Sequence, residues 1–189
     1  MKKRLASVAL IVLILALFAY GTTAYINAEG RATNVITTGT VSLSLTEESG
    51  DGTPIEDQSG VQTGLMFTNV MPSQTLEKKP IVKNEGSQPF WLRVRVDKSF
   101  ESGLSTDVIT TDMDMTLWTK SGDWYYWNEE VAPVEHITVF EHVTFDKTMG
   151  NDYQGKEATI TIQAQAVQTA NNPIPEGGSI TDVAGWPET

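Results

Sequence analysis

Hydrophobic and polar side chains alternate along several stretches of this sequence. In residues 41–46, 91–97, 137–145 and 159–168, almost every second side chain is apolar, and β-branched residues are frequent. A period of two places such side chains on one face of a strand, whereas an α-helix repeats every 3.6 residues. The pattern therefore predicts four strands that each bury one face. The predicted inner parity holds Val41, Leu43, Leu45, Leu92, Val94, Val96, Ile137, Val139, Glu141, Val143, Phe145, Ile160, Ile162, Ala164 and Ala166.

Turn-forming residues separate these stretches. Clusters of Gly, Asn, Asp and Ser stand at residues 48–60, 84–87, 121–123 and 150–155,. They divide the chain into about eight candidate strands with one polar face each, which predicts an all-β, antiparallel two-sheet sandwich. A jelly-roll-like topology is the leading expectation, and an immunoglobulin-like sandwich is the alternative. The candidate strands are residues 34–46, 62–70, 78–84, 89–98, 113–119, 123–128, 135–145 and 156–169.

Two segments lie outside this pattern. Residues 99–112 are compatible with a short helix, and residues 171–189 contain Pro and Gly with little periodicity, which predicts an extended or mobile tail,. The expected organisation is therefore an N-terminal segment at 25–38, a sandwich domain at 39–170 and the C-terminal tail.

The first residues are typical of an exported protein. Three basic residues at positions 2–4 precede sixteen residues without a charge, and small residues follow. This order predicts a signal peptide at residues 1–24; cleavage after Ala24 places Thr22 at −3 and leaves Tyr25 at the mature N-terminus. The alternative is an uncleaved membrane anchor, although a spanning helix needs about 20 apolar residues.

Charge and cysteine content exclude several classes of function. The chain has 24 acidic and 13 basic residues, for a formal net charge of −11, so it lacks the basic surplus that nucleic-acid binding requires,. Without cysteine there is no disulfide framework, thiolate metal site or cysteine nucleophile,. Removal of residues 1–24 takes away three basic residues and no acidic one, which leaves −14. Export without cysteine favours a Gram-positive cell.

The candidate chemistry is sparse. His136 and His142 stand six residues apart in a predicted strand, which separates them by about 20 Å, whereas the helical zinc-protease motif needs them one turn apart,. We interpret them as half-exposed strand residues and predict no metal or other cofactor. No GxSxG nucleophile motif is present,. The acidic loop at 47–52 is interpreted as a solvated turn rather than a calcium site.

Aromatic residues gather in a predicted hairpin. Trp118, Tyr125 and Trp127 share a parity that is expected to fill the core,. Trp124 and Tyr126 then lie on the opposite face, where a sugar or another subunit could cover them. The hairpin thus supports one alternative function, a secreted or surface-bound binding module for wall polymer or sugar.

Four further segments stand out along the chain: a cleavage region, a first strand of the form N-x-I-x-x-G-x-V, a strand–turn–strand with K-x-x-V-x-N-x-G-S, and a final strand. They are residues 21–27, 34–43, 79–94 and 150–168. In this order and spacing they resemble the TasA/camelysin family of exported biofilm-matrix proteins.

The resemblance implies a jelly-roll subunit of extracellular fibres, processed by a SipW-type signal peptidase. Such fibres are thought to assemble by donor-strand addition, in which the freed N-terminal segment of one subunit completes a sheet of the next. The partners implied are further copies of the chain and possible accessory fibre proteins, in the extracellular matrix or at the cell surface. Ile26, Val35 and Ile36 are the apolar donor-strand candidates. Some members of the family are described as metalloproteases, but the histidine spacing gives no basis for transferring catalytic residues.

Overall fold

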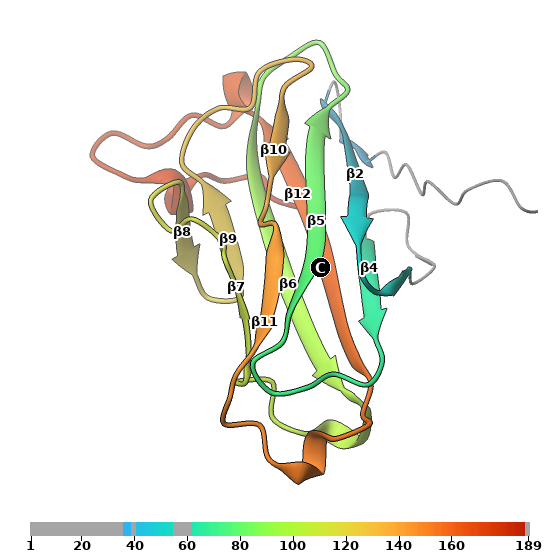
Figure 1. The fold of residues 1–189 in the computed structure, drawn as a ribbon. Helices are drawn as coiled ribbons and strands as arrows, with labels where there is room; N and C mark the ends of the chain where they lie inside the picture. Colours follow the sequence, from blue (N-terminus) through green and yellow to red (C-terminus); the bar gives the residue numbers. More distant parts are fainter. Residues whose placement is uncertain (1–35, 39–40, 55–61, 188–189) are drawn as a thin grey trace, which may run out of the picture. The chain divides into compact units, whose positions relative to one another are not determined.

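Two antiparallel β-sheets face each other in the computed structural model, which confirms the predicted two-sheet sandwich (Figure 1). The structure describes residues 36–38, 41–54 and 62–187. The predicted cleavage residues and the donor candidates before residue 36 lie outside these ranges. The strands are β1 (Ile36–Thr38), β2 (Val41–Gly50), β3 (Thr53–Pro54), β4 (Gln62–Phe67), β5 (Thr75–Asn84), β6 (Phe90–Phe100), β7 (Ile109–Thr111), β8 (Trp118–Ser121), β9 (Trp124–Trp127), β10 (His136–Thr138), β11 (His142–Phe145) and β12 (Ala158–Gln168).

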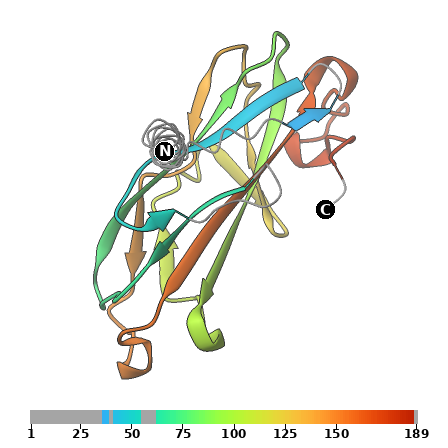
Figure 2. The same cartoon turned by 90° about the vertical axis from the view of Figure 1, so that its right-hand side faces the viewer.

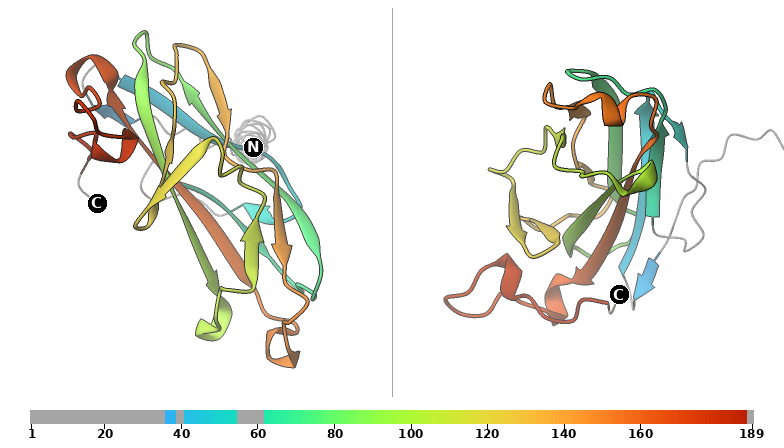
Figure 3. Two further views of the ribbon diagram at one scale, coloured as in Figure 1. Left: turned by 90° about the vertical axis from the view of Figure 1, so that its left-hand side faces the viewer. Right: turned by 90° about the horizontal axis from the view of Figure 1, so that it is seen from below.

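The chain moves repeatedly between the two sheets. The first sheet has the order β1-β2-β5-β11-β7, with β10 also paired to β5, and the second has the order β3-β4-β12-β6-β9-β8. Figure 2 looks at the side that carries β1 to β4, and the right-hand view of Figure 3 looks at the sandwich from one end. The strands β2, β4, β5 and β6 lie alternately in the first and second sheets.

The core lies between the sheets, and the predicted parity largely identifies it. Val41, Leu43 and Leu45 on β2 are at most 1% exposed, and the inner parities of β6 and β12 are buried with them, except for half-buried Val96. Burial of a large aliphatic side chain contributes about 1.5–3 kcal/mol. The alternation of these three strands therefore accounts for a large part of the core between the sheets.

The predicted strand at 135–145 forms two strands because of a proline in its neighbour. β10 and β11 both pair with β5 and keep one register, but the ladder opens between them. There, Val139 N–H donates to Pro80 O at 3.0 Å, and Pro80 has no N–H to donate in return,. The interruption buries Phe140 and exposes Glu141, so the prediction that Glu141 shares the inner face is wrong.

Other predicted boundaries also change. The helix considered at 99–112 is a single 3₁₀ turn, Glu101–Gly103, followed by β7. The strand expected at 113–119 begins only at Trp118, because Asp114 holds a turn through its carbonyl and carboxylate. In the described ranges no helix has the length and apolarity to cross a membrane.

Candidate functional site

The described end of the predicted donor segment is β1, which lies at the outer edge of β2. Ile36 begins β1 and lies opposite Leu43, while Thr22, Ala24, Tyr25, Ile26 and Val35 precede the described residues. β1 pairs with residues 41–43 only, although β2 continues to Gly50. In the described chain, strand pairing on this edge therefore covers only the first third of β2.

The main chain of Leu45 points to this outer edge. Residues in an antiparallel pair alternate between bonding their partner and bonding the opposite side. The main chains of Asn84 and Pro80 on β5 hydrogen-bond to residues on the β10–β11 side. Their partners on β2, Leu43 and Glu47, therefore direct their main-chain groups to the outer edge. Leu45 lies midway between Leu43 and Glu47, so its main-chain N–H and C=O groups point to the same outer edge,. The side chain of Leu45 is fully buried, which fixes β2 in one register,.

An ion pair lies in the sandwich beside the same edge. Lys78 on β5 is 0% exposed, and its Nζ lies 2.6 Å from Glu47 Oε2 on β2. Glu47 lies opposite Pro80, two residues from Lys78 on β5, so its carboxylate reaches the amine diagonally,. Burial lowers the pKa of Lys78, and Glu47 partly opposes that shift. This pair was not predicted from the sequence, although Lys78 shares the parity of Val82 on β5.

The aromatic hairpin of β8 and β9 places its predicted core members on the inner face. Trp118 is 2% exposed, and its ring meets that of Trp127 edge to face with centroids 5.2 Å apart. Tyr125 and Trp127 pack partly buried against the main core. The left-hand view of Figure 3 shows this hairpin beside the two long strands of the second sheet.

The chain's own C-terminal tail covers the opposite face of the hairpin. Tyr126 is only 6% exposed, and it joins a second apolar cluster that contains Ile180 and Val183 from the tail. Half-buried Trp124 and Trp186 pack against the same cluster. The expectation that Tyr126 belongs to an open binding surface is therefore wrong, because an intramolecular segment already occupies that face.

Arg93 organises this second cluster. Its guanidinium carbon lies 4.2 Å from the ring centroid of Trp124 and 4.6 Å from that of Trp186, so the cation stacks between a sheet residue and a tail residue,. Its Nε donates to Gln165 Oε1 at 2.9 Å. Trp91 Nε1 donates to Asn172 O at 2.8 Å and holds the start of the tail.

The two histidines lie on different strands, and each stands opposite a charged residue of β5. His136 is opposite Lys83 and His142 is opposite Glu77, six residues apart on β5. Asp112 accepts hydrogen bonds from the main-chain N–H of His142 and lies 2.8 Å from its Nδ1. The hydrogen bond to Asp112 raises the pKa of His142.

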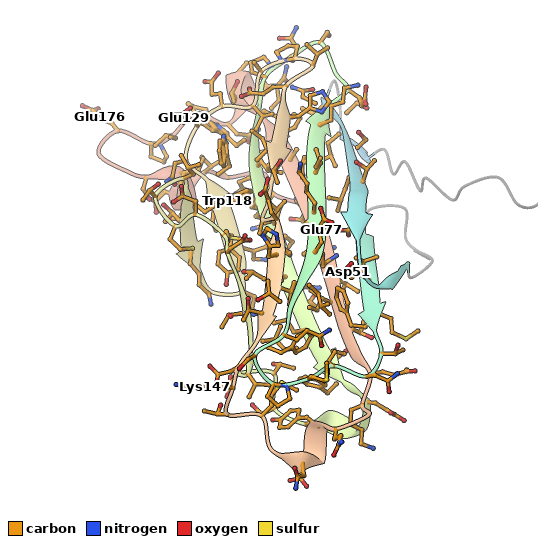
Figure 4. All side chains as sticks on the ribbon, viewed as in Figure 1. Asp51, Glu77, Trp118, Glu129, Lys147 and Glu176 are labelled. Atoms are coloured by element: carbon orange, nitrogen blue, oxygen red, sulfur yellow. The ribbon has the colours of Figure 1, made fainter. Side chains whose placement is uncertain are left out.

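Asp51, in the acidic turn after β2, is bonded to the neighbouring strand β5. Asp51 Oδ2 accepts a hydrogen bond from Glu77 N–H at 2.8 Å, and Asp51 N–H donates to Glu77 O (Figure 4). Among the side chains that the structure describes, no group of three or more His, Asp or Glu residues is placed to hold a metal ion.

Protein-family models, curated proteins and solved structures were all compared with this chain, and none matches it.

Proposed function

We propose that this protein is an exported structural subunit of extracellular, biofilm-matrix fibres that assembles by donor-strand addition. The observation that carries the proposal is the edge of β2, where β1 pairs only with residues 41–43 of a ten-residue strand. Such an edge accepts an added strand through main-chain hydrogen bonds. A contact between an N-terminal segment of one subunit and a sheet edge of the next is heterologous, and its repetition makes a filament.

The acceptor edge has one defined register. The outward main chain of Leu45 provides hydrogen-bonding groups, and its buried side chain prevents a slip by one residue,. An incoming strand needs apolar side chains on one parity only. Ile26 and Val35 are the donor candidates that precede β1, whereas Ile36, the third candidate, pairs opposite Leu43 of its own chain.

The proposed role includes processing at the membrane. A SipW-type signal peptidase cutting after Ala24 would free Tyr25 and the residues that follow,. Assembly would therefore begin only after export, outside the cell. The partners are further copies of the chain and, at fibre ends, accessory fibre proteins.

Deletion of the donor segment tests this function. Residues 25–189 should form filaments in negative-stain micrographs, and deletion of residues 25–33 should abolish them while leaving the circular dichroism of the sandwich unchanged. Filaments that persist after the deletion would refute donor-strand assembly.

A matched pair of variants separates apolar docking from simple loss of length. Ile26→Ser with Val35→Ser removes apolar donor candidates and should reduce filament number strongly. Ala28→Ser with Ala32→Ser changes two small residues in the same segment and should leave filament number near that of the unmodified chain.

A further inference from the structure

The C-terminal tail binds to the second sheet as a separate segment. Its anchors are Ile180 and Val183, which are 6% and 4% exposed, and Trp186, whose ring meets Tyr126 edge to face at 5.6 Å. The short 3₁₀ turn Ile180–Asp182 sets the spacing of these anchors, and the side chains of Ser179 and Asp182 cap it. The anchored part of the tail is therefore a small folded unit with its own cap.

An exposed loop connects this unit to the sandwich. Residues 175–179 are exposed, and Gly177 takes a φ of +74°, a conformation that glycine adopts without strain,. The loop projects away from the sheets, with Glu176 at its far end (Figure 4). Five residues, 175–179, separate Ile174, which packs against the same cluster, from Ile180, and when extended they would span roughly 17 Å,.

The surface that receives the tail belongs entirely to the sheet. Trp91, Arg93, Trp124 and Tyr126 come from β6 and β9, and all of them precede the loop in the chain. Every copy of the protein therefore carries both the complete receiving surface and the complete tail. Aromatic-lined surfaces of this kind suit extended, proline-containing segments, and the tail has Pro at 173, 175 and 187,.

We propose that the tail is exchanged between copies of this chain, so that the anchors of one subunit occupy the Arg93 surface of another. The exchanged contacts are the same ones that the tail makes within its own subunit, which is the basis of domain swapping. The loop at 175–179 acts as the hinge. Because the tail and the β2 edge are different surfaces, exchange adds a subunit contact that does not depend on donor-strand addition.

Two complementary variants test the exchange in the mature chain, residues 25–189. A chain with Val183→Ser and Trp186→Ala keeps the receiving surface but loses the tail anchors. A chain with Arg93→Ala and Trp124→Ala keeps the tail but loses the surface. After filaments are removed by centrifugation, each should be a monomer alone, and their mixture should form a one-to-one complex by native mass spectrometry. A mixture that contains only monomers would overturn the proposal.

A shorter hinge gives an independent measurement in case a surface variant folds poorly. Deletion of residues 175–178 should prevent the tail from reaching its own sheet and convert the chain to dimers or larger closed species. The same deletion with Trp186→Ala should return it to a monomer. A shortened chain that stays monomeric would contradict exchange. Filament loss on deletion of residues 25–33 is scored separately by microscopy, so either proposal can fail alone.

Discussion

Lys78 introduces a charge into the sandwich interior, where its amine bonds Glu47 Oε2 at 2.6 Å. Buried pairs are costly to break, because removal of one partner leaves the other charge in a poorly solvating environment. Glu47→Leu should therefore lower the free energy of unfolding by about 3–5 kcal/mol, because the Lys78 amine is 0% exposed and loses this carboxylate,. Lys78→Met combined with Glu47→Leu should recover most of that loss. Urea denaturation of the two variants measures both values, and an equally unstable double variant would contradict this account.

Asp112 and His142 couple stability to pH at the break between β10 and β11. The hydrogen bond to Asp112 raises the pKa of His142 above 6.5. The stabilisation that protonated His142 contributes to the fold is therefore complete below pH 6.5, and it falls as pH rises through the raised pKa. Partial burial raises the pKa of Asp112, but hydrogen bonds from His142 and Glu141 outweigh it and hold the value below 3.8. The carboxylate's contribution is present above pH 3.8 and falls as pH decreases through the lowered value.

Asp112→Asn should therefore have its largest effect between about pH 4 and pH 6.5. Thermal unfolding of both chains from pH 3 to pH 9 measures the difference in Tm. That difference should narrow at higher pH as His142 loses its proton in the unmodified chain. A difference that grows steadily toward pH 9 would rule out the pair as its source.

At the scale of elements, β4 lies unusually close to β12 at Gly64. A Cβ there would stand 2.9 Å from Ile160 O and 2.7 Å from Thr161 Cγ2, so the strands must separate to accept it. Gly64→Ala should cost about 1–3 kcal/mol of unfolding free energy. Gly150→Ala is the matched control, since a Cβ at Gly150 meets nothing within 4 Å. Equal stability of the two variants in chemical denaturation would show that β4 can move without cost.

The elements also show what the sequence could predict. Alternation identified the inner faces of β2, β6 and β12, because each buries one parity along most of its described length, with Glu47 and Val96 only half-buried. The break between β10 and β11 depends on which residue lies opposite Pro80. The pairing of strands that are distant in sequence determines this, so the alternation pattern could not predict it. The packing of the C-terminal tail on the second sheet is the larger feature that was not predicted from the sequence. Ile180, Val183 and Trp186 recur every third residue, but only the tertiary structure shows that the outer face around Arg93 receives them. The donor-segment residues before 36 remain predictions.

For the whole molecule, the acidic surplus bears on association. The mature chain would carry −14, and exposed carboxylates such as Glu129 and Glu130 lie in a loop without a neighbouring base in sequence. Like charge keeps subunits with open strand edges apart and soluble. Salt screens this repulsion, since the Debye length falls from about 30 Å at 0.01 M to about 8 Å at 0.15 M. The proposed contact at β2 joins main-chain groups, so screening by salt would remove no attraction between opposite charges there.

Sodium chloride should therefore accelerate filament growth over that range, as followed by light scattering of residues 25–189. Glu129→Gln with Glu130→Gln should raise the rate at low salt and weaken its salt dependence, because two repelling charges are gone. Sucrose at the same osmolality carries no charge and serves as the control for excluded-solute effects. A growth rate that falls with salt would instead indicate that opposite charges attract across the subunit contact, and it would place that contact away from the β2 edge.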